Sequence, residues 1–437
     1  MNKKQCLILL LATALSGAVE MKAQNFAGYD SHNYRAAGGM IFNPASIADS
    51  RYKLNVNILS FSVGLDNTAY SIRTASVFSG FDDWKEGKDY SKVQGSGTKD
   101  IHVNADVLGP SFMLDLGKKI GSIGLSTRVR VMLDEVGISN EIFQLIGGYE
   151  TYDYFGKGIA VDKMSLGVHA FADMGLTYAR TVWEDSQHKV KAGVTGKYLS
   201  GFAGGSLHID DLKMKINQDP DLNNIENEDI FESMRGKVAL VYSDGIDKLI
   251  DDGDPMDLLN NMKGSSFGLD LGFEYEWNPS WRRDSLHRTP YLLKASASIT
   301  DIGSVGYTAS KNSGHFALNA DNFKVSDLDA PPEGDTFEAY VDYLKREGIL
   351  TESEAVRKYR IKLPTALRLN VDWNAWRNVF VNVGTVVNLV SKGSFSAKYA
   401  SLFYITPRYE RKFITAYSPI SFGAGNFNWG VGVSAGV

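Results

Sequence analysis

The first candidate for chemistry is an acidic stretch that begins like a calcium-binding loop. Asp219, Asp221 and Asn223 have the D-x-D-x-N spacing whose side-chain oxygens bind Ca²⁺. The stretch then departs from the motif, because Asn224 stands at the glycine position and Ile230 at the position of the closing glutamate. We therefore expect a solvated acidic loop here and no metal site.

No residue pattern typical of a catalytic site occurs in the sequence. The seven histidines are scattered, without an H-E-x-x-H or paired-histidine spacing. Asp173 lies four residues after His169, but a polar network inside a β-barrel explains this pair better than acid–base catalysis does. Cys6 is the only cysteine, and it lies in the N-terminal leader. We expect no enzyme activity, no catalytic residue and no cofactor.

The N-terminus has the organisation of a secretory signal peptide. Lysines at positions 3–4 precede a short apolar stretch over 6–19, which is too short to span a bilayer as a stable helix. A small residue, Ala23, then precedes a polar one. We predict a signal peptide over residues 1–23, with cleavage after Ala18 as the alternative, and export of the mature chain.

The elements that must position any site are β-strands. After residue 50, apolar and polar residues alternate in stretches of about 9–13 residues, the length that a tilted strand needs to cross a membrane. Over 267–277 one face is entirely apolar or aromatic: Phe267, Leu269, Leu271, Phe273, Tyr275 and Trp277.

The composition agrees with a β-barrel and excludes other classes. Charged residues make up 22% of the chain, and no run of about 20 apolar residues follows the leader, which excludes a bundle of membrane helices. The overall composition of a transmembrane barrel is no more apolar than that of a soluble protein, because every second residue faces a polar lumen. The net charge of −5 and the absence of a basic stripe give no reason to expect a nucleic-acid partner.

We predict an all-β fold: a transmembrane antiparallel β-barrel of about 14 strands over residues 51–437, monomeric and in contact with outer-membrane lipid. Residues 24–50 are Gly- and Ala-rich and lack periodicity, so we expect them to form a plug inside the barrel. Two insertions break the strand pattern: 218–262, acidic and partly helical, and 333–358, which reads as an amphipathic helix. Long barrel loops share one side, so both should be extracellular.

The inward faces of the predicted strands carry charges of both signs. A selective pore would show a ring of one sign, whereas mixed charges pair across a narrow lumen. We therefore expect an occluded lumen around the plug. The predicted lumen-facing charges are Arg128, Arg130, Asp173, Lys191, Asp270, Glu274, Arg368 and Asp372.

The motif Asn43-Pro44-Ala45 carries a family resemblance. The layout AAGGMIFNPASIADSRYKLNVN resembles the N-terminal plug of FadL-type fatty-acid transporters, where an NPA motif closes a hatch inside the barrel. Later stretches, such as FGLDLGFEYEW, SITDIGSVGY and LPTALRLNVDWN, resemble a Bacteroidota family of outer-membrane barrels of unassigned function, related to FadL-like and PorV-like barrels. The charged inward faces differ from the apolar pocket of a fatty-acid transporter.

The resemblance implies two alternative functions in the outer membrane. The FadL-like side implies passage of a small hydrophobic or amphipathic molecule past the plug. The PorV-like side implies a non-transporting scaffold or docking protein with partners in secretion or peptidoglycan attachment. The chain stops at Val437 without the terminal aromatic residue usual for such barrels, so either a further strand or domain follows or the end is atypical.

Overall fold

A computed structural model describes most of the chain as antiparallel β-sheet with two short α-helices, α3 (Asn140–Ile146) and α7 (Phe337–Arg346). This confirms the predicted all-β class. The predicted signal peptide and residues 24–29 of the predicted plug lie outside the described residues. The structure describes residues 30, 32–72, 85, 87–93, 97–146, 155–218, 229–243, 246, 264–280, 291–324, 337–391, 396, 398–411, 414–423 and 426–435.

The main sheet contains a continuous row of twelve strands, each hydrogen-bonded to the next in antiparallel register. In order these are β1 (Leu54–Asn57), β6 (Ser111–Asp115), β7 (Ser122–Ile138), β8 (Gly158–Glu184), β9 (His188–Gln218), β11 (Gly264–Trp277), β12 (Leu293–Thr308), β16 (Ala366–Trp376), β17 (Val379–Asn388), β18 (Leu402–Arg411), β19 (Ile414–Tyr417) and β22 (Gly432–Ala435).

The other strands extend this row or form a separate hairpin. Eight belong to the same sheet: β2 (Ser60–Asn67), β5 (Lys99–Leu108), β10 (Asp229–Tyr242), β13 (Gly314–Lys324), β14 (Leu350–Ala355), β15 (Lys358–Lys362), β20 (Ile420–Gly423) and β21 (Asn426–Trp429). A separate two-stranded sheet is formed by β3 (Tyr70–Ile72) and β4 (Tyr90–Lys92).

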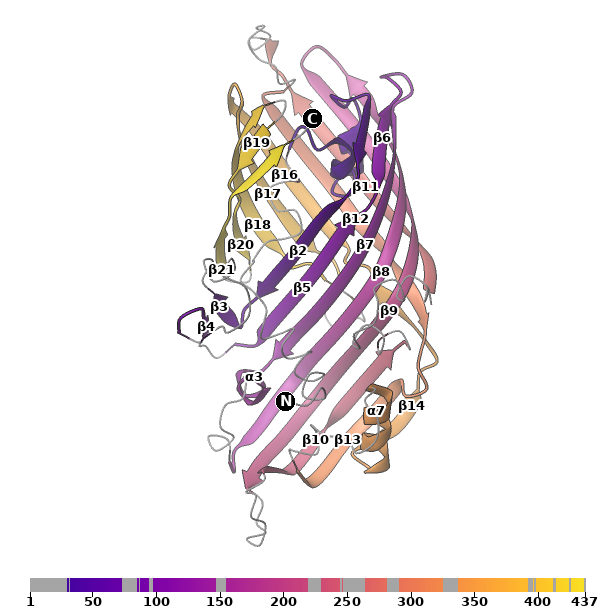
Figure 1. The fold of residues 1–437 in the computed structure, drawn as a ribbon, viewed down its shortest axis with the longest axis vertical. Helices are drawn as coiled ribbons and strands as arrows, with labels where there is room; N and C mark the ends of the chain where they lie inside the picture. The colour runs from indigo at the N-terminus through magenta and orange to yellow at the C-terminus, as the bar shows by residue number, and fades with distance from the viewer. Residues whose placement is uncertain are drawn as a thin grey trace.

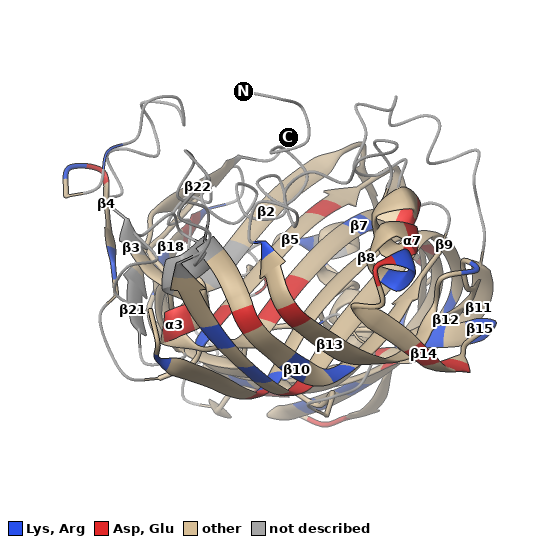
Figure 2. Cartoon of the chain, turned by 90° about the horizontal axis from the view of Figure 1, so that it is seen from below, with Lys and Arg blue, Asp and Glu red and all other residues tan. Residues whose placement is uncertain are grey.

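The sheet curves strongly around an interior, and its two ends lie on the same side of the molecule. Figure 1 shows the indigo strand β2 and the yellow strands β19–β21 on that side, and Figure 2 shows β2 and β22 next to each other around the interior. Within the described residues, no hydrogen-bonded pairing joins β1 or β2 to β21 or β22.

Two strands are longer than the sequence pattern suggested. The sequence pattern predicts a strand end near residue 201 and another near residue 301, but the chain continues through both positions as the single strands β9 and β12. Both contain register shifts at which the alternation changes phase: one lies opposite the Ala170/Phe171 step, and the other opposite the Leu269/Leu271 step. A β-bulge interrupts the pattern without ending the strand, which is why the sequence reads as two strands.

One predicted helical stretch is a strand. Val238, Leu240 and Val241 belong to β10, which pairs with β9 from its first to its last residue and with β13 from Ile230 to Leu240. The prediction of helix over these residues was wrong, because a short apolar run does not separate helix from buried strand by its period alone. The helix predicted over 333–358 is confirmed only over α7, and the prediction was wrong for its last part, which forms β14 and the start of β15. The helix α7 ends before Gly348, whose φ of 72° lets the chain turn back.

The connections divide between the two ends of the sheet. The helices α3 and α7 follow β7 and β13 at one end, where Gly158 pairs with Lys215 and Ile230 with Lys324. The opposite end has tight turns, such as those between β8 and β9 and between β16 and β17. We call these the loop end and the turn end.

The interior is polar at the turn end and apolar at the loop end. At the turn end, β9 buries Lys191 and Lys197 and exposes Val194. At the loop end, the same strand buries Leu212 and Met214, which belong to an apolar cluster with residues of β10 and α3. Among the described residues, no helix is long and apolar enough to cross a membrane.

Candidate functional site: the polar interior and the N-terminal segment

The described part of the N-terminal segment, residues 32–50, folds as two short 3-10 helices, η2 (Ala36–Gly39) and η3 (Pro44–Ile47). Asn43 stands just before η3, and its side-chain oxygen accepts a hydrogen bond from the Ala45 N–H (2.9 Å). Proline suits the next position, because its fixed φ matches the first turn and no N–H donor is needed there. The NPA motif is therefore a capped turn that fixes the direction of the segment.

This turn is seated against two facing glycines in the wall. Gly193 of β9 and Gly272 of β11 are register partners. A Cβ atom on Gly272 would lie 2.0 Å from Asn43 Oδ1, and one on Gly193 would lie 2.5 Å from the Ala45 nitrogen. The Asn43 amide also donates a hydrogen bond to the Phe273 carbonyl (3.1 Å). The absence of two side chains thus lets the motif reach the backbone of the sheet.

The start of the segment is held by polar groups of two strands, β18 and β12, and of the residues just before β12. The Asn33 backbone N–H and side-chain amide both donate to the Glu410 carboxylate, at 3.0 and 2.8 Å. The Asn33 side-chain oxygen in turn accepts from the Tyr291 hydroxyl (2.6 Å) and the Lys294 ammonium (3.1 Å). Every hydrogen-bonding group of the Asn33 amide is therefore used.

Two charged residues attach the rest of the segment. Arg35 forms an ion pair with Glu274 at 3.3 Å. Asp49, near the turn end, forms an ion pair with Lys189. Partial burial by itself would raise the pKa of Asp49, but the hydrogen bond and charge of Lys189, with a further contribution from Lys191, hold this pKa below its ordinary value of 3.8.

Below the segment, charges of opposite sign form a buried cluster. The Arg130 guanidinium contacts Asp173 and Asp301, each at 2.8 Å. The Lys197 ammonium contacts Asp270 and the same Asp301, each at 2.7 Å. Five strands contribute these residues, so the cluster ties β7, β8, β9, β11 and β12 together across the interior. Buried charges are tolerated only when they are paired in this way.

Three further buried ion pairs lie in the same interior: Arg128 with Asp106 at 2.5 Å, Arg408 with Asp372 at 2.6 Å, and Lys191 with Glu276 at 2.6 Å. Arg368 is held differently. Its guanidinium lies over the rings of Phe42 and Tyr399, at 5.5 and 5.4 Å from their centroids. Phe42 belongs to the N-terminal segment, so this contact also joins the segment to the wall.

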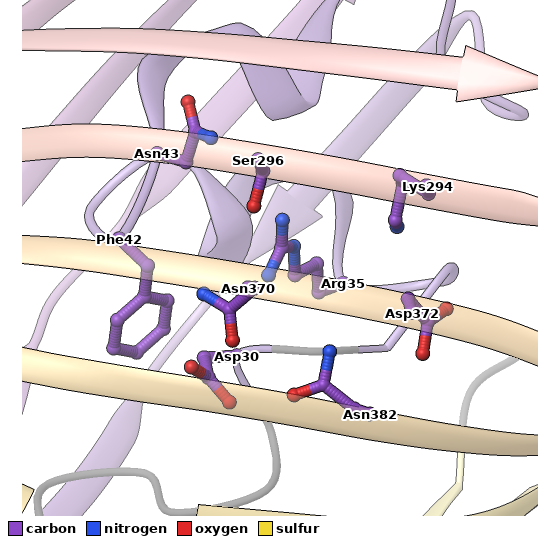
Figure 3. A pocket seen from close by; sticks show the side chains of 9 residues that line it. All are labelled: Asp30, Arg35, Phe42, Asn43, Lys294, Ser296, Asn370, Asp372 and Asn382. Carbon is purple, nitrogen blue, oxygen red and sulfur yellow. The ribbon is translucent and has the colours of Figure 1, made fainter. Parts of the chain in front are cut away.

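A small cavity remains between the segment and the wall (Figure 3). It offers about 10 Å³ to the centre of a water molecule, which is close to the least that holds one ordered water. Its lining is mainly polar: Asp30, Arg35, Phe42 and Asn43 from the N-terminal segment, and Lys294, Ser296, Asn370, Asp372 and Asn382 from β12, β16 and β17.

The structure places all eight predicted lumen charges in the interior, each with 6% or less of its surface exposed. Arg130, Asp173 and Asp270 meet in one cluster, whereas Arg128, Lys191, Glu274 and Asp372 belong to neighbouring pairs.

The interior residues that sequence reasoning missed include Asn33, Asp106, Asp301, Arg408 and Glu410. Arg408 and Glu410 alternate with apolar residues, a period-2 signal that could have revealed them. Asp301 has a φ of 60° and lies where the alternation along β12 is interrupted, so the sequence pattern could not predict that its side chain points inward.

His169 and Asp173 do not form a pair. Asp173 is bound to Arg130, while His169 stacks on Phe171 with ring centroids 4.3 Å apart. Both imidazole nitrogens are buried without a hydrogen-bond partner in the described structure. In the same part of the chain, no group of three or more His, Cys, Asp or Glu side chains could hold a metal ion. The residues of the predicted calcium-like loop up to Asn224 lie outside the described residues.

Comparison with known protein families matches residues 44–437 to a family of unknown function, DUF5723. The chain belongs to this family. The match begins at Pro44, inside the NPA motif, and covers every strand of the DUF5723 sheet. No curated protein matches the sequence.

Proposed function

We propose that this DUF5723 protein is an outer-membrane β-barrel whose interior is closed by its own N-terminal segment and which acts as a non-transporting scaffold. The observation that carries the proposal is the filled interior. Among the described residues, the charges of the interior are largely used in ion pairs, and the cavity at the contact between the segment and the wall offers only about 10 Å³ to the centre of a water molecule. Partners in secretion or peptidoglycan attachment, as in PorV-like barrels, would bind from outside the lumen.

The outer face of the sheet supports a membrane location. Large apolar side chains point away from the interior on strand after strand: Phe267 is 78% exposed, Phe273 58% and Val371 44%. Exposed tryptophans, Trp183 and Trp376, stand beside tight turns at the turn end, where an interfacial girdle is expected. A continuous exposed apolar face of this kind is unfavourable in water.

A second candidate is passage of a small amphipathic molecule past the segment. One observation favours it: the small cavity lies at the contact between the segment and the wall, so a shift of the segment would enlarge it. The segment is attached by hydrogen bonds and ion pairs, which can break and re-form.

The test compares the wild-type protein with a variant that lacks residues 32–48, both reconstituted into phosphatidylcholine vesicles. We expect both proteins to float with the vesicles, the wild-type protein to leave small solutes trapped, and the deletion variant to release them. Solute release by the wild-type protein would favour passage over the scaffold. Failure of the folded wild-type protein to float with vesicles would reject the membrane location itself.

A further inference from the structure

We propose that three basic side chains on β15, Lys358, Arg360 and Lys362, bind the phosphate of an anionic lipid headgroup at the edge of the apolar outer face. The inference rests on the proposed membrane location. It adds a lipid-binding site on the outside of the sheet, separate from the polar interior.

The three basic residues share the outer face of one strand. In β15 the intervening residues, Tyr359 and Ile361, are buried in an aromatic and aliphatic cluster, so Lys358, Arg360 and Lys362 alternate with them and are exposed. Side chains two residues apart on a strand stand on the same face, about 6–7 Å from each other. This spacing lets neighbouring cations contact one phosphate group.

The neighbouring strand leaves room for a headgroup. Lys362, Arg360 and Lys358 pair with Ser304, Gly306 and Thr308 of β12, which are small and uncharged. The Arg360 guanidinium donates to the Ser304 hydroxyl at 2.9 Å and, across β12, to Ser266 at 3.2 Å. Hydroxyl groups therefore stand beside the cations, and both are donors that phosphate oxygens accept.

Two of the three cations, Lys358 and Arg360, are not neutralised by a carboxylate of the described protein. In the described structure, Lys358 and Arg360 have no acidic partner within ion-pair distance, although both are exposed. Of the two glutamates on the preceding strand β14, Glu352 is already bound to Lys345 (2.7 Å), and β14 pairs with β13 instead of β12. Figure 2 shows Lys and Arg positions in blue beside the β12 and β15 labels.

Three cations elsewhere on the outer face differ from Lys358 and Arg360 in this respect. Lys215, Arg235 and Lys237 each have an acidic neighbour, at 2.7, 2.6 and 3.4 Å respectively. A cation with an acidic neighbour attracts an external phosphate less strongly, because the local charges cancel. Lys358 and Arg360 are therefore more available to an external phosphate than these three cations are.

The basic surface directly continues the apolar outer face. After β15 the same chain enters β16, where the outward residues become Leu369, Val371 and Trp373, exposed by 41, 44 and 50%. Next to Lys362, the Leu363 N–H bonds to the Gly303 carbonyl, and Gly303 pairs with Gly268, the neighbour of the exposed Phe267. A lipid whose acyl chain lies on β16 thus places its phosphate beside β15.

The test measures lipid selectivity of the full chain in phosphatidylcholine vesicles that contain a trace of acyl-chain spin-labelled lipid, either phosphatidic acid or phosphatidylcholine. The motionally restricted fraction of each label gives a relative association constant. One basic residue near an anionic surface is worth roughly a fivefold gain in affinity, so we expect the wild-type protein to prefer phosphatidic acid on the order of tenfold. The K358Q/R360Q/K362Q variant should lose this preference.

The K215Q/R235Q/K237Q variant is the matched control: it removes the same charge from cations that have acidic neighbours, and it should keep the preference. Equal loss in both variants would indicate a general charge effect and overturn the site, as would an unchanged preference in the β15 variant. Displacement of the lipid by an equal concentration of soluble glycerol phosphate would overturn the assignment to a membrane lipid. Flotation of all three proteins with vesicles, without any preference for phosphatidic acid, would reject this site and leave the proposed membrane location intact.

Discussion

Gly193 of β9 and Gly272 of β11 pair directly across the sheet, and the Asn43-Pro44-Ala45 turn fills the space in front of them. We expect Gly272→Val to displace the turn, because even its Cβ would lie 2.0 Å from Asn43 Oδ1. Overpacking of this kind costs about 1–3 kcal/mol. The measurement is maleimide labelling of a cysteine placed at Ser46, which should become faster.

Gly196 provides the control for that substitution. It lies on the same strand as Gly193, and a Cβ there would have no atom within 4 Å. Gly196→Val should leave labelling at position 46 unchanged. If the two valine variants label alike, the glycine pair does not determine where the turn sits.

Arg130 contacts two buried carboxylates, so its substitution should destabilise the fold much more than substitution of an exposed arginine does. Arg130→Met leaves Asp173 and Asp301 without their common partner in a buried position. Breaking a buried ion pair from one side costs about 3–5 kcal/mol. Arg235→Met removes an exposed pair with Asp321, and such pairs contribute about 0–1 kcal/mol. Urea unfolding of both variants measures the difference, and equal losses would contradict a buried network.

Asp49 predicts a specific dependence on pH. Because its pKa is lower in the folded than in the unfolded chain, the ion pair with Lys189 stabilises the fold above pH 3.8 and is lost as the pH falls through the lowered value. The pair is partly exposed, so we expect about 1 kcal/mol.

The free energies of unfolding of wild type and Asp49→Asn are compared at several pH values to test this. Wild type should be the more stable protein at pH 7, and the difference should begin to shrink near pH 3.8 and disappear as the pH falls through the lowered pKa of Asp49. A difference that persists at low pH would show that the Asp49 charge is not its source.

The outer face of β11 predicts a depth-dependent cost of charge. Leu271 and Ser265 both point outward and are exposed, but Leu271 lies within the apolar stretch and Ser265 beyond Phe267. In a membrane, Leu271→Arg should cost about 2–4 kcal/mol and Ser265→Arg about 0–1 kcal/mol. Unfolding from lipid vesicles measures both. Similar costs at the two positions would argue against lipid contact along this strand.

The sequence by itself determined the all-β class, because alternation with period 2 is a local property of each strand. The same alternation identified Arg128, Arg130 and Asp372 as inward-facing. The sequence also located α7, whose apolar stripe and terminal glycine are read within one segment of chain.

Only the tertiary structure decided which charges meet. Asp301 bridges Arg130 and Lys197, residues 171 and 104 positions away, and no local pattern encodes such a contact. The phase changes in β9 and β12 and the strand β10 were likewise hidden, because bulges and buried short strands depend on the neighbouring strands rather than on their own sequence. The space that the NPA turn occupies exists only because Gly193 of β9 and Gly272 of β11 lie opposite each other. This alignment depends on how the two strands pair, which neither strand's own sequence specifies.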